Sequence, residues 1–348
     1  MPTTKAYAAY DAKSPLRSFE APRREPRAED VVLEILYCGI CHSDLHQVRD
    51  EWGGTRYPIV PGHEIVGRVV AVGGAVKKVK VGELGAIGCI VDSCRKCEAC
   101  TRGLEQYCAE GMTGTYNSLA RDGSGPTFGG YSRQIVVDEA YLVTVKEQPS
   151  LEAVAPLLCA GITTYSPLRH WKVGKGSRVG VVGLGGLGHM GVKIAAAMGA
   201  EVTLFSSSSK KREDAKRLGA HHYVDMSQDG AVRKLRSTLD FVLDTVSADH
   251  DVAGLLRTLR IDGTLCLVGL PEKPLSVPPF AIVGNRRSLS GSGIGGIAET
   301  QEMLDFCAEH KLTADVEVVP IQKVNEAYDR LTKGDVRYRF VIDNATLT

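Results

Sequence analysis

The sequence lacks an excess of charge of either sign, because 42 Lys and Arg residues stand against 41 Asp and Glu residues, a formal net charge of +1. This balance excludes a broad electrostatic attraction for nucleic acid or for an anionic membrane. Long hydrophobic runs are also missing: the most apolar stretch, Val179 to Ala200, is interrupted by glycines and contains His189 and Lys193. A bilayer span would tolerate those residues only at high cost. We therefore expect a soluble protein whose partner is a small molecule.

The first residues, MPTTKAYAAYDAK, lack the apolar core of a secretory signal. The chain nevertheless contains ten cysteines. In a reducing compartment thiolates persist as metal ligands and do not oxidise to disulfides. We therefore expect a cytoplasmic protein in which some of the cysteines bind metal.

Four of these cysteines form the run C-x2-C-x2-C-x7-C within VDSCRKCEACTRGLEQYC. This spacing lets one short lobe, residues 94–108, arrange four thiolates around a single tetrahedral zinc ion. Disulfides are the alternative interpretation, but cysteines three residues apart rarely bridge without strain. A site closed by four thiolates leaves no open coordination position, so it would stabilise the fold and do no chemistry. The sequence therefore predicts a structural zinc site with the ligands Cys94, Cys97, Cys100 and Cys108.

The local texture of the chain changes near its middle. At 348 residues the chain is long enough for two domains. From Val31 to Val145, short β-branched runs such as VVLEILY and EIVGRVVAVG indicate a mostly β region. Further on, apolar strands alternate with helical segments, which is typical of a βαβ series and a parallel sheet. Gly199 and Gly219 mark two expected helix C-termini. The alternation of strands and helices predicts an α/β fold class.

The expected strand RVGVV leads directly into a G-x-G-x-x-G turn followed by a helical pattern. In a dinucleotide site the first glycine permits the tight turn, the second lets the backbone approach a pyrophosphate, and the third lets helix and strand pack closely. The alternative is a glycine-rich turn used only for packing. We expect the turn to bind a dinucleotide through Gly183, Gly185, Gly186, Leu187 and Gly188.

The end of the next expected strand decides which dinucleotide fits. An NAD site usually carries a carboxylate there for the ribose 2′-hydroxyl. This sequence instead reads FSSSSKKR, with no carboxylate before Glu213. Hydroxyls and cations would bind a 2′-phosphate, so NADP(H) is favoured, although the basic residues could be a solvated helix start. The candidate contacts are Ser206, Ser207, Ser208, Lys211 and Arg212.

Three further clusters could supply a second metal site: CGICHSDLH with Cys41, PGHEIVG with His63 and Glu64, and LLCAGITTY with Cys159. Two thiolates and one imidazole would leave zinc one open position, and an open zinc polarises an alcohol or carbonyl oxygen. Each cluster is a weak signal by itself, because single cysteines and histidines are commonly core residues. That core role is the interpretation for Cys38, Cys89, Cys266 and Cys307.

Six motifs in order resemble one family. They are GICHSDLH, PGHEIVG, the four-cysteine lobe, APLLCAGITTY, the glycine turn and the closing YRFVID. From near residue 31 to the C-terminus they are similar to the zinc-containing medium-chain alcohol dehydrogenases, and within them to the cinnamyl alcohol dehydrogenase type of NADP-dependent aldehyde reductase. The resemblance implies a GroES-like catalytic domain over residues 1–150 and a Rossmann domain with a doubly wound parallel sheet over 151–295. Residues 296–348 would return to the catalytic domain.

The resemblance also implies ligands, cofactors and partners. Cys41, His63 and Cys159 would bind the catalytic zinc, and Glu64 could approach the metal. With the lobe, the chain would hold two Zn²⁺ ions and NADP(H), and it would form a homodimer through the Rossmann sheets. Asp44 would orient a ligand imidazole, although Ser43 and Asp44 could merely cap a helix beginning near Leu45.

The remaining roles concern the substrate and the nicotinamide. Ser43 and His46 match a relay that passes the substrate proton to solvent. Trp52 matches a wall of the substrate pocket, although a tryptophan packed in a loop is an equally good interpretation. The positions that match contacts to the nicotinamide half of the cofactor are Thr163, Thr245, Gly269 and Ile294.

The expected function is a zinc-dependent NADP(H) alcohol dehydrogenase or aldehyde reductase of broad aryl or alkyl range. Hydride would pass directly between NADPH and a carbonyl that zinc polarises. A polyol or amino-alcohol dehydrogenase of the same fold is one alternative. A zinc-stabilised nucleotide-binding sensor without turnover is an alternative of another class.

Overall fold

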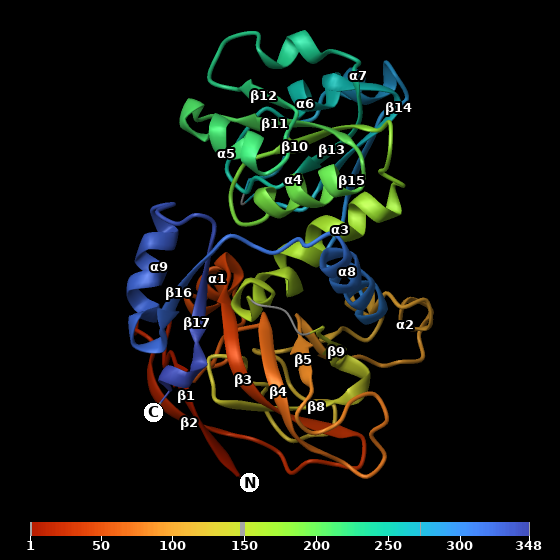
Figure 1. Ribbon diagram of the computed structural model, residues 1–348. Helices are drawn as coiled ribbons and strands as arrows, with labels where there is room; N and C mark the ends of the chain where they lie inside the picture. Colours follow the sequence, from red (N-terminus) through yellow and green to blue (C-terminus); the bar gives the residue numbers. More distant parts are fainter. Residues whose placement is uncertain (1, 147–149, 272, 348) are drawn as a thin grey trace. The chain divides into compact units, whose positions relative to one another are not determined.

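The computed structural model describes residues 2–146, 150–271 and 273–347. The chain divides into two compact units (Figure 1). Unit 1 combines Met1–Cys159 with Gly295–Thr348, and unit 2 is Ala160–Ile294. The last residues of the chain therefore belong with its first half. No helix in the described part of the chain has both the length and the apolar character needed to cross a membrane.

Unit 1 is built on a seven-stranded, largely antiparallel sheet with the strand order β16-β17-β3-β4-β5-β9, in which β8 also pairs with β3. The central strand β3 (Asp30–Ile40) pairs with β4, β8 and β17, so strands from both ends of the chain meet on it. Alternating buried residues along β3 supply one face of the core. The mostly β character expected for this part of the chain is confirmed.

The other strands of unit 1 are shorter than β3. The strands are β1 (Thr3–Ala8), β2 (Arg17–Pro22), β4 (Ile65–Val72), β5 (Leu84–Ile87), β6 (Ile90–Asp92), β7 (Thr113–Gly114), β8 (Gln134–Asp138), β9 (Val143–Thr144), β16 (Val316–Pro320) and β17 (Arg339–Asp343). The helices are α1 (His42–Val48), α2 (Glu98–Thr101), α8 (Ile297–Glu309) and α9 (Val324–Thr332). A 3₁₀ turn, Ala155–Leu158, leads to the end of the first segment.

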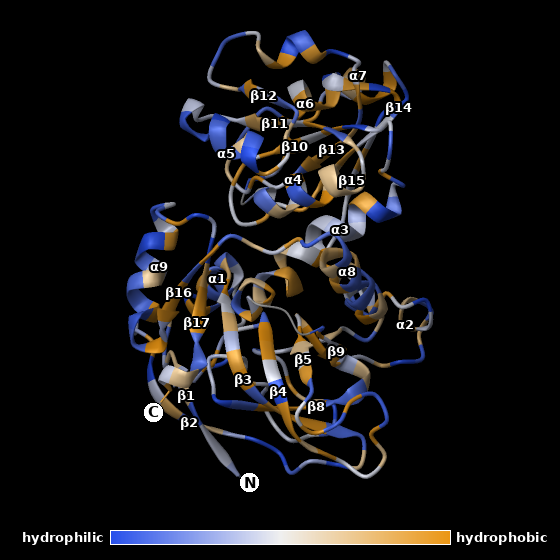
Figure 2. Ribbon diagram, viewed as in Figure 1, coloured by the Kyte–Doolittle hydropathy of each residue, from blue (hydrophilic) through white to orange (hydrophobic). Residues whose placement is uncertain are grey.

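Unit 2 contains a six-stranded sheet in the order β12-β11-β10-β13-β14-β15, and every neighbouring pair is parallel. Numbered from its first strand, this is the order 3-2-1-4-5-6 of a doubly wound dinucleotide-binding fold. The expected parallel α/β sheet is confirmed. Figure 2 shows hydrophobic residues along β10 and β13, which agrees with strands buried on both faces.

The strands of unit 2 are β10 (Arg178–Val182), β11 (Glu201–Ser206), β12 (His222–Asp225), β13 (Leu239–Asp244), β14 (Leu259–Leu267) and β15 (Ser288–Gly291). Its helices are α3 (Ala160–His170), α4 (Gly188–Ala197), α5 (Arg212–Arg217), α6 (Val252–Thr258) and α7 (Pro279–Val283). The helices α4 and α5 each end before a glycine with a positive φ angle, Gly199 at 86° and Gly219 at 107°. A left-handed residue at this position ends a helix, as expected from the sequence.

The glycine turn between β10 and α4 has little room for side chains. Gly183 has a φ angle of 90°, a conformation that glycine adopts at little cost. A Cβ atom on Gly188 would lie 2.0 Å from the carbonyl oxygen of Gly183, whereas a Cβ on Gly185 would meet no atom within 4 Å. The third glycine therefore allows the turn to close, and the second leaves open space above the backbone.

Replacing Gly188 with alanine should lower the free energy of unfolding, because the added methyl group clashes with fixed backbone. We expect a loss of about 1–3 kcal/mol, as for other overpacked sites, measured by urea unfolding. Gly185→Ala is the matched control and should leave stability nearly unchanged. Equal stabilities of the two variants would contradict this account of the turn.

Candidate catalytic metal centre and nucleotide site

The four cysteines of the lobe lie together. Their sulfur atoms are all within 4.8 Å of one another, and the Sγ atoms of Cys94 and Cys100 are 3.9 Å apart. The backbone N–H of Cys97 donates to the Sγ of Cys94 at 3.4 Å, and that of Ala109 donates to the Sγ of Cys97 at the same distance. Hydrogen bonds from Ala109 and Cys100 lower the pKa of Cys97 to about 6. The backbone is therefore arranged to stabilise thiolates, as a four-sulfur zinc site requires.

The lobe is fastened to the rest of unit 1 by polar contacts. The Arg95 guanidinium pairs with Asp138 at 2.8 Å and lies 5.0 Å from the centre of the Tyr141 ring. The Glu105 carboxylate accepts a hydrogen bond of 3.1 Å from the backbone N–H of Ile297, at the start of α8. The lobe therefore holds the beginning of α8 as well as its own cysteines.

A second cluster gathers Cys41, His63, Glu64 and Cys159, whose ligand atoms all lie within 4.8 Å of one another. The Sγ atoms of Cys41 and Cys159 are 3.9 Å apart, and all four residues are buried. Three separate segments supply them. Cys41 follows β3, His63 and Glu64 directly precede β4, and Cys159 follows the 3₁₀ turn Ala155–Leu158. The residues that the resemblance assigned to the catalytic zinc are therefore close enough to share one ion.

The Asp44 carboxylate connects two of these ligands. One oxygen accepts a hydrogen bond from Nδ1 of His63 at 3.0 Å, and the other accepts one from the backbone N–H of Cys41 at 2.9 Å. The second bond belongs to the capping arrangement at the start of α1, which begins at His42 and not near Leu45, so Asp44 contacts the His63 imidazole and also takes part in capping the helix. In the neutral imidazole whose Nδ1 donates to Asp44, Nε2 of His63 carries the lone pair that a metal needs.

The charges around the site favour a bound cation. Burial would lower the pKa of His63, but Asp44 and the neighbouring thiols raise it well above its ordinary value. The pKa of Cys41 is held well below its ordinary value, first by hydrogen bonding to Cys159, whereas contact with Cys41 and Cys89 raises the pKa of Cys159. The two thiols interact, so they do not lose their protons independently. Metal binding requires both as thiolates and would release the protons that they carry.

Glu64 has a partner that the sequence did not reveal. Its carboxylate pairs with Arg339 of β17, and both side chains are buried. Burial raises the pKa of Glu64 to about 8, and the Arg339 charge opposes that rise. A Cβ atom at Gly39 would lie 1.9 Å from Oε2 of Glu64, so position 39 must lack a side chain to admit the carboxylate. This Oε2 atom is buried and has no hydrogen-bond partner among the described residues, which fits a group that can turn to a metal.

Cys89 was expected to be an ordinary core residue, but it lies beside the cluster. Its thiol interacts with Cys159, and that contact is the main reason why the pKa of Cys89 is lowered. Position 89 shows no local pattern with positions 41, 63 or 159. Sequence spacing could not have identified it for that reason.

The remaining candidates of unit 1 lie on α1 and just after it. The Oγ of Ser43 is 3.6 Å from the Sγ of Cys41. The His46 ring stacks on Trp52 with 5.2 Å between ring centres, and its Nδ1 contacts the Glu51 carboxylate. Trp52 is half exposed, so its indole offers a flat apolar surface beside His46. Glu51 was not predicted, and the structure adds it as the partner that orients His46.

In unit 2 the glycine turn and the segment after β11 are connected. The Lys211 ammonium donates to the carbonyl of Leu184, inside the turn, at 2.7 Å. Ser206 is buried at the end of β11, and its Oγ accepts a hydrogen bond from the backbone N–H of Ser208 at 3.3 Å. Ser207 and Arg212 are exposed. Hydroxyls and cations therefore stand where an NAD site would carry a carboxylate, and the residues fit a 2′-phosphate.

The four residues assigned to the nicotinamide half belong to different parts of unit 2. Thr163 on α3 is buried, and its hydroxyl has no partner in the part of the chain that the structure describes. Thr245 donates to the carbonyl of Val182 at 2.7 Å. A Cβ atom on Gly269 would lie 2.3 Å from the carbonyl oxygen of Val246. Ile294 is the last residue of unit 2 and has a φ angle of 37°. A buried hydroxyl without a partner among the described residues fits a contact to the cofactor at Thr163.

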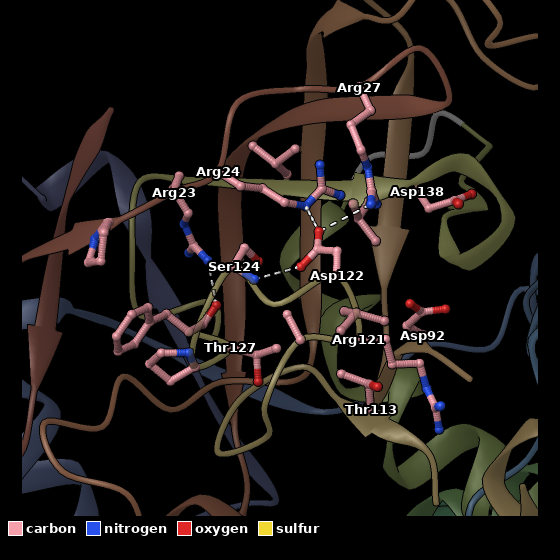
Figure 3. A pocket seen from close by; sticks show the side chains of 17 residues that line it. Arg23, Arg24, Arg27, Asp92, Thr113, Arg121, Asp122, Ser124, Thr127 and Asp138 are labelled. Carbon is pink, nitrogen blue, oxygen red and sulfur yellow. Dashed lines mark hydrogen bonds and ion pairs between the residues drawn. The ribbon is translucent and has the colours of Figure 1, made fainter. Parts of the chain in front are cut away.

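A pocket of about 100 Å³ in unit 1 differs in character from the two sites above. Figure 3 shows the side chains that line it, many of which are charged. Arg27 pairs with Asp122 at 3.1 Å, and the same carboxylate accepts from the backbone N–H of Ser124 at 2.9 Å. Arg23 donates to the carbonyl of Phe128 at 2.6 Å. None of the candidate metal ligands lines this hollow. Its ion pairs tie neighbouring loops together and belong to the fold.

Comparisons with known proteins agree with both sites. Residues 27–147 match the family described as alcohol dehydrogenase GroES-like domain, and residues 186–309 match the family described as zinc-binding dehydrogenase. The aldehyde reductase YahK of Escherichia coli is 58% identical over 346 residues, which cover 99% of each chain.

Two solved structures are also similar. A cinnamyl alcohol dehydrogenase from Sorghum bicolor superposes with a TM-score of 0.95 at 46% identity, covering 99% of this chain and 98% of that one. The CAD from Helicobacter pylori, solved as a complex with NADP(H), superposes with a TM-score of 0.92 at 41% identity and covers 99% of both chains. With its two cysteine-rich sites and its glycine turn, this chain belongs to the zinc-containing medium-chain alcohol dehydrogenase family.

Proposed function

We propose that this protein is a zinc-dependent NADP(H) alcohol dehydrogenase that works as an aldehyde reductase of broad aryl or alkyl range. The observation that carries the proposal is the buried set of Cys41, His63, Glu64 and Cys159, with ligand atoms within 4.8 Å of one another. A set with two sulfurs, one imidazole and a carboxylate that can move is suited to a metal with an open position. A sensor without turnover would have no need of such a set.

The protein's own residues hold and orient the reactants. Cys41, His63 and Cys159 would bind the catalytic zinc, and Asp44 keeps His63 in the tautomer that presents Nε2. When bound, zinc supplies a Lewis acid that polarises the carbonyl, and NADPH supplies the hydride. Arg339 holds the Glu64 carboxylate beside the ligands, where it can approach the metal in the resting state.

A proton has to reach the product oxygen. We assign the Ser43 hydroxyl, close to Cys41, as the first group of this path and the His46 imidazole as the outer group, because an imidazole exchanges protons near neutral pH. Glu51 would act on His46 as a positioning residue. Trp52, stacked on His46, is assigned to the wall of the substrate pocket, where a flat ring suits an aryl or alkyl group.

The nucleotide contacts are proposed from the glycine turn and the segment after β11. The turn residues from Gly183 to Gly188 would bind the pyrophosphate, and Ser206, Ser207, Ser208, Lys211 and Arg212 would surround the 2′-phosphate. The assignments of Thr163, Thr245, Gly269 and Ile294 to the nicotinamide half rest on the family resemblance. The Thr163 hydroxyl has no hydrogen-bond partner among the described residues, and this supports the assignment of Thr163.

The substrate class follows from the similar proteins. The names of the E. coli and Sorghum bicolor proteins refer to aldehyde reduction and to cinnamyl alcohol, and we extend aryl and alkyl aldehydes to this chain on that basis. A polyol or amino-alcohol substrate is the alternative within the same fold. The basic segment after β11 supports NADPH as the reductant.

We expect the purified protein to oxidise NADPH when benzaldehyde or cinnamaldehyde is added, and to do so faster than with NADH. Elemental analysis should find about two zinc ions per chain, one for each ligand set. Sorbitol and threonine with NADP⁺ test the alternative substrates. A flat absorbance trace across the aldehyde panel, from protein with both metal sites filled, would overturn the proposed activity.

Replacing Asp44 with asparagine should weaken zinc binding at the catalytic site alone, because the amide cannot hold His63 as a carboxylate does. Loss of such a supporting group typically costs about 10–100-fold in metal affinity. After dialysis against a chelator, the variant should keep about one zinc ion per chain, the one in the lobe. Asp251→Asn, which changes a helix cap in unit 2, is the control and should keep both. Retention of both ions by Asp44→Asn would show that Asp44 does not support the metal.

We further propose a homodimer joined through unit 2 and located in the cytoplasm. Strand β15 lies at the edge of the parallel sheet, and the helix before it exposes Phe280 and Val283, at 85% and 71%. Edge strands with exposed apolar neighbours invite pairing with a second copy. The location is supported by the ten cysteines of the chain, because a reducing compartment keeps cysteines available as metal ligands.

Sedimentation equilibrium should find a dimer for the natural protein, and Phe280→Asp should shift it toward the monomer. The physical reason is that a charge in the middle of an apolar contact would be desolvated without a partner. Glu213→Asp, an exposed change elsewhere in unit 2, is the control. A natural protein that is monomeric at about 10 μM, far above the Kd of a stable dimer, would contradict the proposal.

A further inference from the structure

Tyr223 on β12 contacts two residues of the segment that would bind the 2′-phosphate. Its hydroxyl donates to the backbone carbonyl of Ser208, and the Arg212 guanidinium lies 4.7 Å from the centre of its ring. From this geometry we propose that Tyr223 is a positioning residue that holds the Ser206–Arg212 segment in shape and so sets the preference for NADPH over NADH. The proposal rests on the proposed function and names a residue that the motifs of the chain did not identify.

The sheet fixes the position of Tyr223. Strands β11 and β12 are parallel, and Leu204 is the partner of Tyr223 in their register. The pairing continues to Ser206 and Asp225, so the first residue of the Ser206–Arg212 segment is itself paired with β12. A side chain on a strand moves less than one on the exposed segment, so Tyr223 can serve as a fixed support.

The contact with Tyr223 leaves the hydrogen-bonding edge of Arg212 available. A cation–π contact uses the face of the guanidinium, while the N–H groups that bind phosphate lie in its plane. In the described part of the chain Arg212 forms no ion pair with a carboxylate. The Asp225 carboxylate, at the end of β12, instead accepts a hydrogen bond of 2.6 Å from the Ser227 hydroxyl. Lys211 differs, because its ammonium donates to the carbonyl of Leu184. Of the two candidate cations Lys211 and Arg212, Arg212 is therefore the better placed to bind the added phosphate.

The contacts of Tyr223 with Ser208 and Arg212 lower the entropic cost of binding a phosphate. The short 3₁₀ turn Ser209–Lys211 lies between Ser208 and Arg212, so holding these two residues restricts the whole turn. A restricted segment loses less conformational entropy when a phosphate binds it. The effect should appear only for ligands that carry a 2′-phosphate, because the glycine turn binds the rest of the dinucleotide.

The test measures binding of 2′,5′-ADP and of 5′-AMP to the zinc-loaded protein by isothermal titration calorimetry. Tyr223→Leu removes the ring and the hydroxyl, and we expect about five- to tenfold weaker binding of 2′,5′-ADP, the size of a cation–π contact plus one hydrogen bond. Tyr223→Phe keeps the ring and should weaken it about two- to threefold. Binding of 5′-AMP should stay within about twofold in both variants, because 5′-AMP lacks the 2′-phosphate and its 5′-phosphate would meet the unchanged glycine turn.

Two controls isolate the mechanism. Tyr10→Leu makes the same substitution at a tyrosine of unit 1 whose ring lies 4.1 Å from the Arg17 guanidinium, and it should leave 2′,5′-ADP binding unchanged. If Tyr223 acts through Arg212, the double variant Tyr223→Leu, Arg212→Ala should bind 2′,5′-ADP little more weakly than Arg212→Ala alone. NADPH-to-NADH selectivity in the aldehyde assay should fall in parallel.

The outcomes separate this inference from the proposed function. If the natural protein binds 2′,5′-ADP no more tightly than 5′-AMP, the NADP(H) assignment itself fails. If the natural protein discriminates and both Tyr223 variants discriminate equally well, only the role of Tyr223 fails. Equal losses for 2′,5′-ADP and 5′-AMP in Tyr223→Leu would indicate general damage to unit 2 and would also overturn the positioning role.

Discussion

The candidate active site depends on a single buried carboxylate. Asp44 accepts hydrogen bonds from Nδ1 of His63, from the backbone of Cys41 and from the backbone of Gly62. One group therefore sets the orientation of an imidazole ligand and the position of two chain segments that carry ligands. Without a partner a buried carboxylate would be costly, so these three donors also account for its presence in the core. The same hydrogen bonds therefore stabilise the buried carboxylate and orient a metal ligand.

The metal centre also uses two neighbouring strands of the sheet in unit 1. Strand β3 leads into Cys41, and its neighbour β17 supplies Arg339 from close to the C-terminus. The ion pair between Arg339 and Glu64 compensates the charge of a carboxylate that Gly39 makes room for. Antiparallel pairing of these strands is thus what brings the cation to the ligand set. The C-terminal segment is a part of the site for this reason.

Unit 2 contains the residues proposed to bind the dinucleotide, which is a large anion. The glycine turn presents backbone without side chains, and the segment after β11 adds hydroxyls and cations. Its contacts with Leu184 and Tyr223 tie this exposed segment to the turn and to the neighbouring strand. Unit 1 therefore carries the buried candidate metal ligands, and unit 2 carries the proposed anion site. The family to which the chain belongs is consistent with this division.

The sequence by itself determined the features that depend on neighbouring residues: the four-cysteine lobe, the glycine turn after its strand, and the helix ends at Gly199 and Gly219. Spacing along the chain is enough there, because the interacting groups are close in sequence. Only the tertiary structure decided that Arg339 pairs with Glu64, 275 residues away, and that Cys89 lies beside Cys159. Sequence alone could not choose between the two roles of Asp44. The partners are brought together by strand pairing and core packing, which leave no local pattern in the chain.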